Sequence, residues 1–152
     1  MELSQAIREA LEHQIFEHEP GQAALSLRDG INEHGPEAVA AGLLDAAAIA
    51  LRRMVAETDE AYDHDELLER LALDGAVPPD NVDVLGRMMV LAAATAGGIR
   101  PSVAAAVADL GAERALFGAW LAALAVIRIV AMSLERTEAD VTEEVLGVLG
   151  VL

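Results

Sequence analysis

The chain has 152 residues and a formal net charge of −16 at neutral pH. It is long enough for one domain with its own core, and its acidic excess argues against binding nucleic-acid phosphates or an anionic membrane surface. The absence of cysteine excludes disulfides, thiolate metal sites and cysteine nucleophiles, and the absence of lysine excludes Schiff-base chemistry and a P-loop lysine.

The composition favours packed helices over sheets. Hydrophobic residues make up 54% of the chain but aromatic residues only 3%, so the core has to be built from Ala, Leu, Val and Ile. The lysine-free, alanine-rich usage indicates a GC-rich, bacterial genome. The first residues show no basic stretch followed by an apolar run, so we expect a cytoplasmic protein.

The first half of the chain predicts three helices. Apolar residues recur at every fourth position from Leu3 to Ile15, which indicates an amphipathic helix, and we expect it to end near residues 19–21 because of Pro20. A short helix follows over about 24–31. Gly35 and Pro36 then separate it from a third helix that extends to about residue 57.

The second half predicts four or five more helices. After a polar stretch at 58–66, we expect a short helix near 67–73, helices at about 81–96, 102–110 and 112–135, and a last one that Thr137 caps and that reaches Leu149. Alternating patterns typical of strands do not occur. The sequence therefore predicts an all-α fold: a single domain over residues 1–152, built as a compact bundle of about seven helices around the long apolar helix 112–135.

The segment 115–133 is apolar enough to suggest a membrane span, but Arg128 lies inside it. An arginine in the middle of a span costs about 2.5–3.5 kcal/mol even on the lenient insertion scale. A helix that is apolar on all sides is either a membrane span or a core helix. We therefore expect the central helix of a soluble bundle and no contact with a membrane.

Arg128 and Asp45 are lone charges in apolar surroundings, and a buried charge needs a partner. We hypothesise that they pair across two helices, or else that each reaches water at the edge of the bundle. A third possibility is a small-molecule site, an apolar pocket between helices along 116–132. There Arg128, Asp45 and Trp120 would bind and orient a ligand.

The acidic segment around Asp63, His64 and Asp65 has the highest density of possible metal ligands. Its spacing does not fit a calcium-binding EF-hand loop, because His64 and Arg70 occupy the positions of a glycine and a carboxylate. A metal-dependent hydrolase that uses these residues with distant carboxylates is an alternative. The preferred interpretation is a solvated acidic loop, with no cofactor, and surface positions for His13 and His18.

The sequence offers no nucleophile motif, so we favour a binding protein over an enzyme. Its apolar helices, including the C-terminal residues from Val145 onward, exceed what one small bundle readily buries. Exposed apolar surface on a soluble chain indicates partners. The main functional hypothesis is therefore a non-catalytic helical interaction or regulatory module, a homodimer or the binder of another protein, without a nucleic-acid partner.

Overall fold

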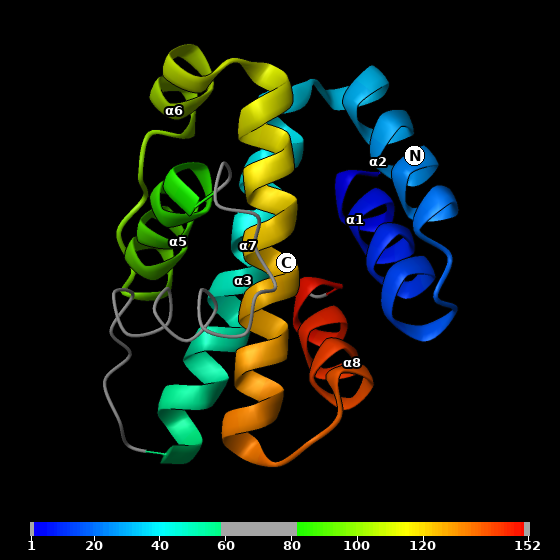
Figure 1. Ribbon diagram of the computed structural model, residues 1–152, viewed down its shortest axis with the longest axis vertical. Helices are drawn as coiled ribbons and strands as arrows, with labels where there is room; N and C mark the ends of the chain where they lie inside the picture. The colour runs from blue at the N-terminus through cyan, green and yellow to red at the C-terminus, as the bar shows by residue number, and fades with distance from the viewer. Residues whose placement is uncertain (1, 59–81, 151–152) are drawn as a thin grey trace.

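The computed structural model describes residues 2–58 and 82–150, and within these ranges it contains α-helices, one π-helical turn and no strand (Figure 1). The all-α bundle predicted from the sequence is confirmed. The elements are α1 (Leu3–Leu11), η1 (Glu12–Phe16), α2 (Pro20–His34), α3 (Pro36–Thr58), α5 (Val82–Ala96), α6 (Val103–Leu110), α7 (Ala112–Leu134) and α8 (Glu138–Leu149).

Two long helices, α3 and α7, form the centre of the bundle. They lie side by side and run in the same direction, with α5 and α6 on one side of the pair and α1, α2 and α8 on the other (Figure 1). Both helices are rich in alanine, whose small side chain lets helix axes approach closely. Their facing sides make up most of one continuous core cluster, to which α1, α5 and α8 add larger side chains.

Helix α7 is the long apolar helix predicted at 112–135. With a mean hydropathy of 2.1 it is long and apolar enough to cross a membrane, but more than half of its apolar stretch is buried inside the bundle. Gly118 lets α5 cross it closely, because a Cβ atom at this position would overlap the Cγ1 atom of Val84 and lie 3.1 Å from Cγ of Met88. The core position expected from the sequence is confirmed.

The N-terminal helix ends earlier than its apolar pattern indicates. The α-helical hydrogen bonding of α1 stops at Leu11 and continues as the π-helical turn η1, and His18 then takes a left-handed conformation with a φ of 56°. Pro20 is the first residue of α2, a position where its missing N–H costs nothing. The expected end near 19–21 is wrong, because the helical turns stop at Phe16, about one turn earlier, and Pro20 starts the next helix.

Two of the later helices begin at side-chain caps, of which the sequence predicted the one at Thr137. The hydroxyl of Ser102 accepts a hydrogen bond from the backbone N–H of Ala105, and the hydroxyl of Thr137 accepts one from that of Asp140 at 3.1 Å. Just before, Glu135 has a left-handed φ of 55°, which ends α7 and turns the chain back so that α8 packs on α3.

Candidate functional site

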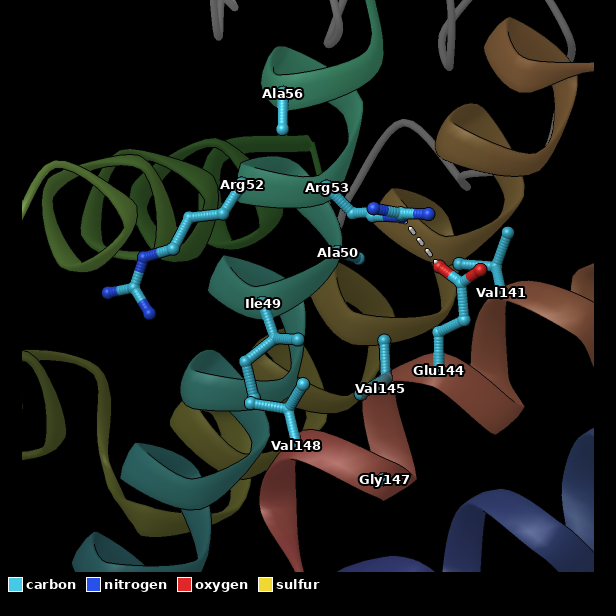
Figure 2. Close-up of a pocket in the computed structure, with 10 residues that line it drawn as sticks. All are labelled: Ile49, Ala50, Arg52, Arg53, Ala56, Val141, Glu144, Val145, Gly147 and Val148. Carbon is cyan, nitrogen blue, oxygen red and sulfur yellow. Dashed lines mark hydrogen bonds and ion pairs between the residues drawn. The ribbon is translucent and has the colours of Figure 1, made fainter. Parts of the chain in front are cut away.

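A hollow with a predominantly apolar lining lies between the C-terminal half of α3 and α8. Its volume is about 590 Å³. Figure 2 shows Ile49 of α3 and Val148 of α8 close together. Val141 and Val145 of α8 also line the hollow. Val148 is 44% exposed although it is apolar, so α8 leaves part of its apolar face uncovered at this point.

Arg53 and Glu144 line this hollow and belong to a group of four charged side chains. Arg53 contacts Glu57 at 2.7 Å and Glu144 at 2.9 Å, and Arg136 contacts the same two carboxylates, each at 2.8 Å. The result is a closed ring of alternating charges that joins the end of α3, the α7–α8 turn and α8. Figure 2 shows its Arg53–Glu144 contact beside the apolar lining. We refer to Arg53, Glu57, Arg136 and Glu144 as the charge ring.

A second hollow, of about 600 Å³, lies on the neighbouring face of α3 and shares Ile49 and Arg52 with the first. The connection from α5 to α6, residues 97–102, forms its other wall. Arg52 holds this wall in place, since its Nη2 donates to the carbonyl oxygen of Thr95 at 2.7 Å and its Nε to that of Ala96 at 3.1 Å. A guanidinium at a helix C-terminus also neutralises the partial negative charge there.

Asp45 lines the second hollow together with apolar side chains from both walls, including Leu44, Ala48 and Ile99. Burial raises the pKa of its carboxyl above the ordinary aspartate value, and the guanidinium groups of Arg100 and Arg52 counteract this only in part. Within the described residues, no hydrogen bond or ion pair reaches this carboxylate. Asp45 is thus a partly desolvated acid without a contact partner in that part of the chain.

Arg128, Asp45 and Trp120 do not line a common hollow among those described. Arg128 and Asp45 are both exposed, so the burial that would have required them to pair is absent, and the cations that act on Asp45 are Arg100 and Arg52. Trp120 is half-buried and packs against the core. The two hollows, and a third one lined by residues 34–41 and 101–104, have no lining residue from 116–132. Of the three candidates, only Asp45 lines one of them.

The proposed metal ligands Asp63, His64 and Asp65 lie outside the described residues. A different group of possible ligands comes together near the N-terminus, where His13 Nδ1 lies 2.8 Å from Glu17 and 4.0 Å from Glu19. The hydrogen bond to Glu17 raises the pKa of His13 above its ordinary value. These side chains all reach solvent, and the contacts among them account for their proximity.

Sequence reasoning missed the two hollows and the charge ring, because each depends on residues far apart in the chain. The one available signal was the clustering of arginines at the end of the third predicted helix, where Arg52 and Arg53 follow an apolar run. No protein-family model, curated protein sequence or solved structure matches this chain. The functional argument therefore rests on the geometry of α3 and its neighbours.

Proposed function

We propose that this protein is a non-catalytic helical interaction module that forms a homodimer through the hollow between α3 and α8. The observation that carries the proposal is the apolar lining of this hollow next to the exposed Val148. Apolar surface in a concave site is stabilised when a partner covers it, and the gain scales with the area removed from water.

Charge favours this part of the surface as the place where a second copy binds. A chain with a net charge of −16 repels its own copies. The charge ring beside the α3–α8 hollow contains two arginines and two glutamates, so the ring carries no net charge. Two copies that approach with these rings facing each other meet less repulsion than over the acidic remainder of the surface.

A twofold arrangement would also cover the exposed Val148. In a twofold dimer the same patch serves both subunits, so Val148 of each copy can enter the hollow of the other. Val148 stands at the mouth of its own hollow beside Ile49 (Figure 2), which is the position such an exchange requires.

The test is the molecular mass in solution, measured by sedimentation equilibrium over a wide range of protein concentrations. We expect the wild type to approach twice its monomer mass of 15.9 kDa and to associate more strongly at higher salt, where repulsion between the acidic subunits is screened. A wild type that remains monomeric at the highest concentration and at high salt would refute the proposal.

A matched pair of variants locates the interface. Val148→Glu places a charge in the proposed contact and should make the protein monomeric. Val90→Glu is its control, because Val90 of α5 is also 44% exposed and does not line the hollow. Circular dichroism confirms that both variants are folded. Dimers of equal strength in both variants would exclude the α3–α8 hollow as the interface.

A further inference from the structure

The second hollow presents two opposite charges that do not touch. Asp45 of α3 lines it on one side, and Arg100 lines it from the α5–α6 connection. Arg100 is close enough to act on the carboxyl of Asp45 electrostatically, yet within the described residues neither side chain forms an ion pair or hydrogen bond. The two groups thus leave space between them.

Arg52, the third charged residue that lines the second hollow, already has hydrogen-bond partners. Arg52 donates two hydrogen bonds to the C-terminal carbonyl groups of α5, which fixes its guanidinium at the wall. Arg100 follows the left-handed Gly98 and the exposed Ile99 in the connection and is itself exposed. Arg100 is therefore the available donor for an anionic group, and Asp45 is the available acceptor for a cationic one.

A ligand with a single charge fits this arrangement poorly. A carboxylate bound to Arg100 would meet the negative charge of Asp45, and an amine bound to Asp45 would meet the positive charges of Arg100 and Arg52. A ligand that carries both groups on neighbouring atoms places each charge next to its opposite. The remaining walls are apolar, with Leu44, Ala48 and Ile99 among their side chains, and they would cover an apolar substituent.

We propose that this hollow binds a free α-amino acid with an apolar side chain. The ammonium group donates to the carboxylate of Asp45, the carboxylate accepts from the guanidinium of Arg100, and the side chain packs between α3 and residues 98–101. A volume of about 600 Å³ accommodates the larger members of this class, such as leucine and phenylalanine. The proposal does not depend on the homodimer, because neither charged residue lines the α3–α8 hollow.

Isothermal titration calorimetry with three related compounds tests the charge requirement. The probes are L-leucine, L-leucinamide, which lacks the carboxylate, and N-acetyl-L-leucine, which lacks the ammonium group. A charge-assisted hydrogen bond is strong enough that losing either group should weaken binding about tenfold or more. No detectable binding of L-leucine or L-phenylalanine, or equal binding of all three probes, would overturn the proposal.

Variants assign the binding to these residues. Asp45→Asn and Arg100→Gln should each weaken L-leucine binding by about tenfold, since each removes one charged contact. Asp29→Asn and Arg28→Gln are matched controls on the exposed face of α2 and should bind like the wild type. Thermal unfolding shows that all four are folded. Unchanged binding in folded Asp45→Asn would overturn the assignment, as would equal losses in the controls.

Discussion

Replacing Gly118 by alanine tests how tightly α5 and α7 are packed. The new Cβ would overlap Cγ1 of Val84 and approach Cγ of Met88 and the carbonyl oxygen of Val84, the last at 3.5 Å. Val84 is short and branched, so it cannot swing away as a longer side chain could. Overpacking of this kind costs about 1–3 kcal/mol. Alanine recovers about 1 kcal/mol of helix propensity, which leaves a net loss of up to about 2 kcal/mol relative to the wild type.

Urea unfolding followed by circular dichroism measures this loss at a fixed protein concentration. Gly21→Ala is the control: Gly21 also lies in a helix, but a Cβ there has no atom within 4 Å, so this variant should be as stable as the wild type or slightly more so. If steric overlap is the cause, Gly118→Ala combined with Val84→Ala should lose at least about 0.5 kcal/mol less than the sum of the single variants. Equal stability of Gly118→Ala and Gly21→Ala would refute the close crossing.

Three further predictions concern charged groups. In a double-mutant cycle of Glu57→Gln and Arg136→Gln, the charge ring should show a coupling of about 0.2–1 kcal/mol that decreases at high salt, since its members are only partly buried. Arg52→Met should accelerate hydrogen exchange at the end of α5, as seen by mass spectrometry, while Arg114→Met, in an exposed position, should not. Folding raises the pKa of the Asp45 carboxyl. The protonated side chain therefore contributes its full stabilisation at pH values below the ordinary aspartate pKa, and this stabilisation is lost as the pH rises through the pKa of Asp45 in the folded protein. The unfolding free energy of wild type relative to Asp45→Asn should therefore decrease over that pH range, whereas a constant difference would contradict the raised pKa.

The fold could be predicted because its signals are local. Helical periodicity, proline at helix starts and the capping hydroxyl of Thr137 act within a few residues, and the structure places the long helices close to where these signals put them. The π-helical turn after Leu11 was not predictable in the same way, because the apolar pattern continues through it to Ile15.

The site could not be predicted because it depends on side-chain direction and on distant pairs. The apolar chain neighbours of Asp45 and Arg128 suggested a buried pair, with exposure of each charge at the edge of the bundle as the alternative. In a helix each residue points about 100° away from the one before it. Leu44 and Ala46 face the core while Asp45 between them reaches the surface, and the same holds for Ile127, Ile129 and Arg128.

The parallel arrangement of α3 and α7 has a consequence for how fast the protein folds. Helices that run in the same direction cannot be joined by a short turn, so every contact between these two closes a long loop through α5 and α6. The α1–α2 hairpin can form from neighbouring residues, but the central pair requires non-local encounters. We therefore expect stopped-flow refolding to be slower than for antiparallel bundles of similar length, whose contacts are mostly local.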